Sequence, residues 1–439
     1  MMKNFLDRFF KIEAHNSTVR TEILAGITTF LTMSYIILVN PVVMSDAGIN
    51  LGAAFVATCL AAAVGCFLTG ILANYPVAVA PSMALNAYFT YDIVQKLGYS
   101  WETALGAVFI SGVMIIILTV TKFRRWLIES IPQSLNIAIA SGIGLFIALV
   151  ALKMGGIIKP DVYTLLALGQ LNTFSISSMK ILLFFLGFLI IIILSHHRVP
   201  GSIIIGIITI SLLGMFLGIN HFHGFVSLPP SIHSTLFVLN FKMLFHREGL
   251  IIIFTFFLIT LFDSTGTLIG LIEQTKITRD ANKAARLSNA LMSDAIATTA
   301  GALLGTSTTS PYLESAAGIK VGGKTGLTAI IVGFCFLIML FFSPLGESIP
   351  TYATGPALLY VSCLMLRHIA YVNWDDLTES IPSIITFMMI PFTFSIADGV
   401  GLGFISYVFI KLLTGKIKDL NVMLIILTIA FGFYFMLRP

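Results

Sequence analysis

The feature that most constrains this chain is a series of apolar stretches that recurs along almost its whole length, from Ile23 to Leu437. Each stretch has roughly 17 or more residues, which as a helix is enough to cross about 30 Å of hydrocarbon. Only 10% of the 439 residues are charged, whereas a soluble domain has about 25%. The sequence therefore predicts a single polytopic, all-α membrane domain. Its net charge of +5 is carried by loops and is not a nucleic-acid signal.

Fourteen membrane spans are predicted. We place them at 21–40, 52–73, 77–97, 101–121, 133–152, 178–195, 200–219, 249–271, 286–304, 306–320, 326–343, 351–370, 381–397 and 399–414. With the N-terminus in the cytoplasm, most of the 25 Lys and Arg fall on the cytoplasmic side, as the positive-inside rule requires. Residues 1–20 have an amphipathic pattern and are expected to lie at the cytoplasmic face of the inner membrane, ahead of a transporter domain at 21–439.

The four cysteines all fall in predicted spans, and no pair has CxxC spacing. We expect Cys59, Cys66, Cys335 and Cys363 to be buried apolar residues rather than disulfide partners or metal ligands. Neither a metal nor a cofactor is expected.

The chain also contains an internal repeat. Ile131-Pro132 and Ile349-Pro350 each open a span, and Val199-Pro200-Gly201 precedes a span that corresponds to the one opened by Val400-Gly401. Two halves of seven spans result, near 1–220 and 221–414, and an odd number of spans inverts the second half. Inverted repeats are typical of secondary transporters with a site at mid-membrane. Chance similarity between apolar segments is the alternative, and residues 420–437 are either a fifteenth span or a peripheral helix.

Spans 3 and 10 are interrupted in a similar way. Short stretches that favour strand, 77–79 and 306–309, precede Pro81 and Pro311. Since proline suits the first turn of a helix, each span should be a short strand followed by a half-helix. The two segments are third in their halves, so the repeat should bring them together, with strand paired to strand and free helical N–H groups offered to a ligand. A simple proline kink is the alternative.

Carboxylates inside spans are costly, so they usually have a partner or a task. Asp263 lies deep in span 8 within a polar patch that includes Ser264 and Thr267, and Glu314 is expected on the first turn of the second half-helix. Either could take up and release a proton, or serve a structural hydrogen bond or a helix cap. Two further acidic residues receive structural readings: Asp294 in helix packing and Asp398 in a loop.

Asn86 follows Pro81 by five residues and is expected to face the same crossing. Carboxamides and carboxylates pair with the N–H and NH₂ edges of bases, so Asp263, Glu314 and Asn86 form a set suited to a planar base. Aromatic residues that could stack on it are Phe30, Phe262, Tyr88 and Tyr312, although any one of them could equally be a core or lipid-facing residue.

At these residues the chain resembles the AzgA-like purine permeases of the nucleobase–cation symporter-2 superfamily. The resemblance rests on residues 21–33, 39–41, 80–89, 262–268, 305–318 and 322–327. One departure is that Ser82 and Ala84 stand where the family usually has glycines, which could narrow the site or change which purine fits.

The resemblance implies a seven-plus-seven inverted repeat with a core domain (about 21–121 and 249–343) and a gate domain (about 133–219 and 351–414). It implies proton symport of adenine, guanine or hypoxanthine by an elevator-type movement, with dimers formed through the gate domains. Asp263 and Glu314 would couple to the proton. The substrate-binding residues would be Asp263, Glu314, Asn86, Thr28, Thr29, Phe30, Ser264, Thr267, Thr309 and Tyr312.

Two other transport functions stay open, and an enzyme is not expected. An anion exchanger of the same fold would place helix N-termini against an anion, which Asp263 and Glu314 would repel. A uracil or xanthine permease would be a closer relative, but those proteins generally carry Glu in span 8. The sequence contains neither an HExxH nor a GxSxG motif.

Overall fold

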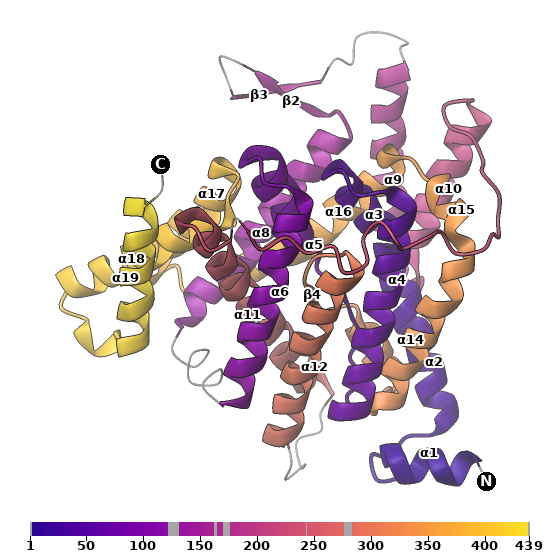
Figure 1. Ribbon diagram of the computed structural model, residues 1–439, viewed down its shortest axis with the longest axis horizontal. Coiled ribbons are helices and arrows are strands. Elements are labelled where there is room, and N and C mark those ends of the chain that lie inside the picture. Colours follow the sequence, from indigo (N-terminus) through magenta and orange to yellow (C-terminus); the bar gives the residue numbers. More distant parts are fainter. Residues whose placement is uncertain are drawn as a thin grey trace.

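The computed structural model describes residues 2–121, 131–161, 165–169, 176–242, 244–275 and 283–437, and most of them are helical (Figure 1). Within these ranges, eight helical stretches are long and apolar enough to cross a membrane: Val19–Asp46, Leu51–Ala73, Trp101–Val120, Gln133–Met154, Ile176–His196, Glu248–Ile272, Gly326–Gly346 and Ile396–Leu413. Three shorter apolar helices are Ser202–Phe216, Leu377–Thr393 and Val422–Met436. The chain is therefore a mostly helical, multi-pass membrane protein.

Helices from the beginning and the middle of the chain pack into one body, which we call the first helix group. Its members are α2 (Val19–Met33), α3 (Ile36–Asp46), α4 (Leu51–Leu68), the π-helical turn η1 (Thr69–Ala73), α6 (Trp101–Val120), α11 (Arg247–Gln274), α12 (Lys283–Leu304) and α14 (Gly326–Met339). In it, α12 packs against α4 and α6, and α14 packs against α2 and α4. Gly326 opens α14 where a Cβ would overlap the backbone of Gly70 in η1, so only glycine permits this approach.

A second helix group packs beside the first. Its members are α8 (Gln133–Met154), α9 (Ile176–His196), α10 (Ser202–Phe216), α16 (Thr351–Leu366), α17 (Leu377–Thr393) and α18 (Ile396–Leu413). Here α8 contacts both α16 and α17, and α17 contacts α18. Lys96, in the segment between η1 and α6, contacts the second group, because its Nζ donates to the carbonyl oxygen of Thr393 at the end of α17 over 2.8 Å.

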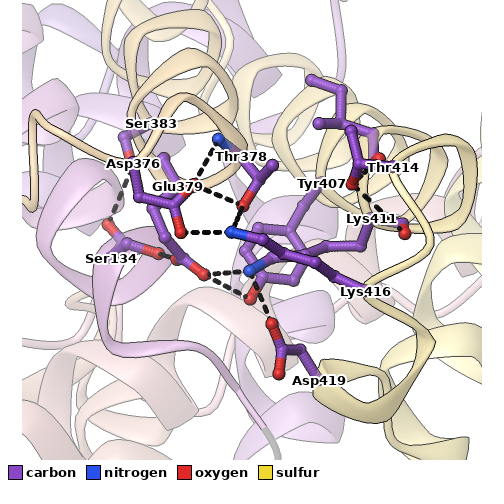
Figure 2. A network of polar contacts seen from close by, with 11 residues as sticks. Ser134, Asp376, Thr378, Glu379, Ser383, Tyr407, Lys411, Thr414, Lys416 and Asp419 are labelled. Atoms are coloured by element: carbon purple, nitrogen blue, oxygen red, sulfur yellow. Dashed lines mark hydrogen bonds and ion pairs between the residues drawn. The ribbon is translucent and has the colours of Figure 1, made fainter.

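A polar network fastens one end of the second group (Figure 2). The buried Lys411 of α18 lies 2.6 Å from Glu379 Oε1 and 2.8 Å from Asp419 Oδ2. Tyr407 and Ser134 also donate to the Glu379 carboxylate, so this one side chain links α8, α17 and α18.

A second, more exposed ion pair continues this network. Lys416 Nζ lies 2.6 Å from Asp376 Oδ2 at the start of α17. The hydrogen bond from Lys416, with two more from the hydroxyl and N–H of Thr378, holds the pKa of Asp376 well below its usual range.

Packed against α3, α4, α11 and α12 of the first group, two short strands cross and pair. They are β1 (Val79–Pro81) and β4 (Thr309–Pro311), antiparallel, with Val79 opposite Pro311, Ala80 opposite Ser310 and Pro81 opposite Thr309. Each strand includes its proline, whereas we expected the strands to end before it. The extended backbone accepts proline in a two-stranded sheet because every strand there is an edge strand.

The half-helices start later than expected for the same reason. After β1 come α5 (Met83–Ala87) and the π-helical η2 (Tyr88–Lys96), and after β4 comes α13 (Ser315–Val321). Neither Pro81 nor Pro311 is therefore a first-turn residue.

The N-terminal helix α1 (Met2–Phe10) lies across one end of the first helix group (Figure 1). Phe10 and Ile12 are buried against Leu327, and Asn74 Nδ2 donates to the carbonyl oxygen of Phe10 over 2.9 Å. The amphipathic segment is therefore docked on the membrane domain rather than separate from it.

The segment beyond the repeat forms helix α19 (Val422–Leu437), which packs on α18. Tyr434 donates to Asp398 Oδ1 over 2.7 Å, and Phe431 stacks on Phe404 of α18 and meets Phe254 of α11 edge-on. Asp398 is buried on the first turn of α18, so its assignment to a loop was wrong. The helix starts there because Ser395 caps it by accepting from the Asp398 N–H.

Other elements are short, and two expectations need correction. A second sheet pairs β2 (Ile158–Asp161) with β3 (Leu165–Leu168), which the sequence did not predict. Cys363 is exposed and Cys335 is only partly buried, so burial holds for Cys59 and Cys66 alone. The remaining elements are η3 (Leu340–Phe342), α15 (Ser343–Glu347), η4 (Arg367–Tyr371) and η5 (Ile417–Asp419).

Candidate functional site

The crossing of β1 and β4 is the centre of the candidate site. Beyond the paired strands, Ser82 N donates to Thr308 O over 2.8 Å and Tyr312 N donates to Ala78 O over 2.9 Å. The Tyr312 hydroxyl donates to Pro81 O over 2.6 Å. These bonds satisfy the backbone of two segments that leave the helical pattern deep in the protein. They also fix the direction of the backbone at residues 82 and 314, which follow the two strands.

Asp263 reaches the crossing from α11. It is partly buried, and Ser82 Oγ donates to its Oδ2 over 3.1 Å, with a further hydrogen bond from Ser310. One donor lies just past β1 and the other lies within β4. Ser82 is one of the two positions expected to depart from the family's usual glycines, and its hydroxyl supplies the carboxylate with a hydrogen bond.

Glu314 reaches the crossing from the other broken segment. It stands at the N-cap position of α13, one residue before the first turn, because Leu313 and Glu314 form a turn instead of helix. Its Oε1 accepts from the Tyr35 hydroxyl over 2.6 Å. Tyr312 is buried within electrostatic reach of both Glu314 and Asp263, so one aromatic residue lies near both carboxylates.

Asn86 does not join this pair in the described structure. Its Nδ2 donates to Asn40 Oδ1 and its Oδ1 accepts from Ser307, while Asn40 in turn donates to Thr58 and Thr306. The side chain is 1% exposed. The carboxamide is thus occupied by a buried network between α3, α4, α5 and the residues before β4. Asn86 therefore meets the residues just before β4 at the crossing, and its hydrogen bonds within the described residues go to Asn40 and Ser307.

The three residues expected from α2 have separate surroundings. The Thr28 hydroxyl donates to Leu24 O of its own helix over 2.8 Å. Thr29 is fully buried and lies where a Cβ on Gly318 of α13 would overlap it. Phe30 packs edge-to-face on Phe336 of α14, with ring centroids 5.3 Å apart. Of these three, Thr29 is the one in contact with a half-helix.

The other residues expected to bind substrate also differ from one another in their surroundings. Ser264 is buried beside Asp263, and among the described residues its hydroxyl has no hydrogen-bond partner. Thr267 is partly buried one turn further along α11. Thr309 belongs to β4 and shares hydrogen bonds with Thr298 of α12, which makes it part of the scaffold.

Two of the aromatic candidates remain. Tyr88 meets Phe256 of α11 edge-on, with ring centroids 5.1 Å apart. The side chain of Phe262 lies outside the described part of the chain.

Sequence reasoning missed Tyr35 and the hydrogen-bonding role of Ser82. Tyr35 lies in a two-residue break between α2 and α3, which contains neither proline nor glycine and so gives no local signal. A tyrosine hydroxyl in an apolar span was the available clue, because a buried hydroxyl usually finds a partner. Ser82 stood out by departing from the family pattern.

Comparisons with known proteins agree on a class. Residues 20–402 match the family described as Permease family (Xan_ur_permease). The chain is 44% identical over 429 residues to adenine permease AdeP of Escherichia coli K12, covering 98% of this chain and 95% of that protein. It is 39% identical over 431 residues to guanine/hypoxanthine permease PbuO of Bacillus subtilis, covering 96% and 98%.

The solved structures support the fold. The transmembrane domain of the cyanobacterial bicarbonate transporter BicA aligns with a TM-score of 0.64 at 14% identity, covering 88% of this chain and 97% of that one.

Proposed function

The chain belongs to the permease family, among its AzgA-like purine permeases, and from this premise we propose that it takes up adenine, guanine or hypoxanthine together with protons. The observation that carries the proposal is the convergence of two carboxylates on one crossing. Asp263 and Glu314 are 51 residues apart in the sequence. Each accepts a hydrogen bond from a hydroxyl group beside the β1–β4 sheet. Two acceptors near one tyrosine suit a flat heterocycle that carries several N–H groups.

In the proposed cycle, one carboxylate takes a proton and the other accepts hydrogen bonds from the purine. Neutralising charge lowers the cost of moving the site through the low-dielectric interior. When proton and base leave on the cytoplasmic side, the site is charged again. One proton that moves through about 100 mV supplies roughly 2.3 kcal/mol, enough for about 50-fold accumulation. Asn86 stabilises the residues just before β4 through its buried hydrogen bonds, and Ser264 and Thr29 supply further hydroxyls.

The movement we propose is of the elevator type. The first helix group, with β1, β4 and their half-helices, is the core that carries the site, and the second helix group is the gate. The fourteen spans would form two inverted halves of seven, with the N-terminus in the cytoplasm, a location in the inner membrane and a dimer formed through the gate. The positive charge of the predicted cytoplasmic loops supports this orientation.

The fold alone does not choose between purines and anions, since BicA shares it. An anion site would have to hold a negative ligand next to Asp263 and Glu314, where like charges repel. Curated relatives with 39–45% identity are named for adenine, guanine or hypoxanthine. Both observations favour purines.

Transport by carboxylate variants tests the proposal. We expect Asp263→Asn and Glu314→Gln each to reduce purine uptake to background in cells that lack their own purine permeases, with protein amount and thermal stability retained. Glu248→Gln is the matched control, since Glu248 opens the same helix as Asp263 and bonds Tyr99 instead. Normal proton-driven uptake by both site variants would exclude the assigned roles.

A further inference from the structure

The hydrogen bond between Tyr35 and Glu314 is supported by the burial of Tyr35 and by a second contact to the backbone of Glu314. Tyr35 is 1% exposed, and its hydroxyl donates to Glu314 Oε1 over 2.6 Å. From the same region of α2, Thr32 Oγ1 lies 3.4 Å from the carbonyl oxygen of Glu314. The break between α2 and α3 therefore touches both the side chain and the backbone of this residue.

Backbone packing fixes this geometry. Helix α13, which begins directly after Glu314, lies so close to α2 that a Cβ on Gly318 would overlap both Thr29 and the carbonyl of Ala25. This close approach sets the spacing of α13 and α2, across which the Tyr35 side chain reaches the Glu314 carboxylate. The hydroxyl is therefore a built part of the site rather than a chance neighbour.

A phenol hydroxyl has one hydrogen to give, and it is a better donor to a carboxylate than to a neutral carboxyl group. A purine N–H group would compete for the same oxygen. A proton on Glu314 would weaken the same bond by removing the charge that the hydroxyl senses.

We propose that Tyr35 is a positioning residue for Glu314, holding the charged carboxylate until a proton or a purine N–H replaces the hydroxyl. The inference rests on the proposed function and deepens it. In this account Tyr35 sets the pH at which the transporter loads and limits how tightly the purine is bound. Ser82 does not share this role, because it donates to the other carboxylate.

The experiment is the pH profile of labelled adenine uptake by proteoliposomes containing Tyr35→Phe, which removes one oxygen and keeps the ring. The upper pH limit of uptake, taken at half-maximal rate, should rise by roughly one to two pH units, since the charged form of Glu314 loses a charge-assisted hydrogen bond. KM for adenine should fall by about fivefold, because the base no longer displaces a hydroxyl. Tyr91→Phe is the matched control, as its hydroxyl bonds the Asp46 carboxylate over 2.8 Å, and it should show neither change.

A second variant keeps the test decisive if Tyr35→Phe folds poorly. Incorporation of 3-fluorotyrosine at position 35 preserves the ring and makes the hydroxyl a stronger donor, so the upper pH limit should fall instead of rise. If wild-type protein carries purine with a pH limit that neither variant moves, Tyr35 is only a packing residue and the inference is overturned. If the wild-type protein carries no purine, the proposed function itself is wrong.

Discussion

Ala80 and Ser310 lie directly opposite each other in the antiparallel pair formed by β1 and β4, although they come from different halves of the chain. This pairing is what brings a donor to Asp263 from each broken segment. Outside the three paired positions, it is extended by the bond from Ser82 N to Thr308 O.

Proline at position 82 tests the hydrogen bond from Ser82 N to Thr308 O. Ser82 has φ −76°, which proline adopts, but the proline ring would occupy the place of the N–H that meets Thr308 O over 2.8 Å, so Ser82→Pro deletes the donor and also pushes the two segments apart. We expect a loss of about 3 kcal/mol or more in the free energy of unfolding, measured by thermal unfolding of the purified protein. Ser82→Ala is the control: it keeps the N–H and should retain stability while losing the hydrogen bond to Asp263. Equal stability of the two variants would mean that the crossing does not depend on this bond.

The Lys411 network predicts that loss of its buried ion pair costs far more stability than loss of the exposed pair between Lys416 and Asp376. Lys411→Met leaves the Glu379 carboxylate without its cation in a mostly buried place, which should cost about 3 kcal/mol of stability. Lys416→Met removes a partner of Asp376 in the exposed pair and should change the free energy of unfolding far less, because solvent screens this pair.

The double variant Lys411→Met with Glu379→Gln separates charge from packing. It should be more stable than Lys411→Met alone, because the unpaired carboxylate is gone. Additive losses would show that Lys411 acts only through its aliphatic chain.

Close packing at Gly326 predicts that alanine lowers stability there but not at Gly432. A Cβ there would meet the backbone of Gly70, which cannot move without shifting η1. Gly326→Ala should therefore lower the thermal stability markedly and reduce the yield of folded protein. Gly432→Ala in α19 is the control, since a Cβ there meets nothing within 4 Å and alanine favours the helix by roughly 0.5–1 kcal/mol. A neutral Gly326→Ala would contradict the tight crossing of η1 and α14.

Movement of the two helix groups relative to each other can be tested at Lys96 and Thr393. Cysteines at both positions, joined in a Cys363→Ser background by a flexible thiol-specific cross-linker with a disulfide in its spacer, should stop uptake, and reduction of that disulfide should restore it. The matched pair is Lys416→Cys with Asp376→Cys, where both positions lie at one end of the second group and the same cross-link should leave uptake intact. Full uptake with the Lys96–Thr393 link in place would argue against an elevator movement.

The broken spans could be predicted because their cause is local. Two prolines preceded by strand-favouring residues announce a break wherever they occur in an apolar span. Their exact ends could not be read in the same way, since the φ that proline imposes suits an extended strand as well as a helix start. The helix α5 begins at Met83, two residues beyond Pro81, and a two-residue delay turns a helical side chain by about 200°. In the structure Asn86 contacts Asn40 and Ser307.

The partners of the carboxylates depend on tertiary packing. Asp263 and Glu314 stood out because a charge in an apolar span is rare. Tyr35 meets Glu314 only because α13 packs closely on α2, and no pattern near residue 35 encodes that contact. The same holds for Asp398, whose partner Tyr434 lies in a helix beyond the repeat.

The most direct test of the central claim is uptake of labelled adenine, guanine and hypoxanthine by proteoliposomes that contain only this protein, with an imposed pH gradient, acidic outside. The account predicts that at least one purine accumulates above its outside concentration, that an uncoupler abolishes the accumulation, and that Asp263→Asn and Glu314→Gln vesicles show none. Accumulation that survives the uncoupler, or bicarbonate or another anion carried in place of every purine, would contradict it.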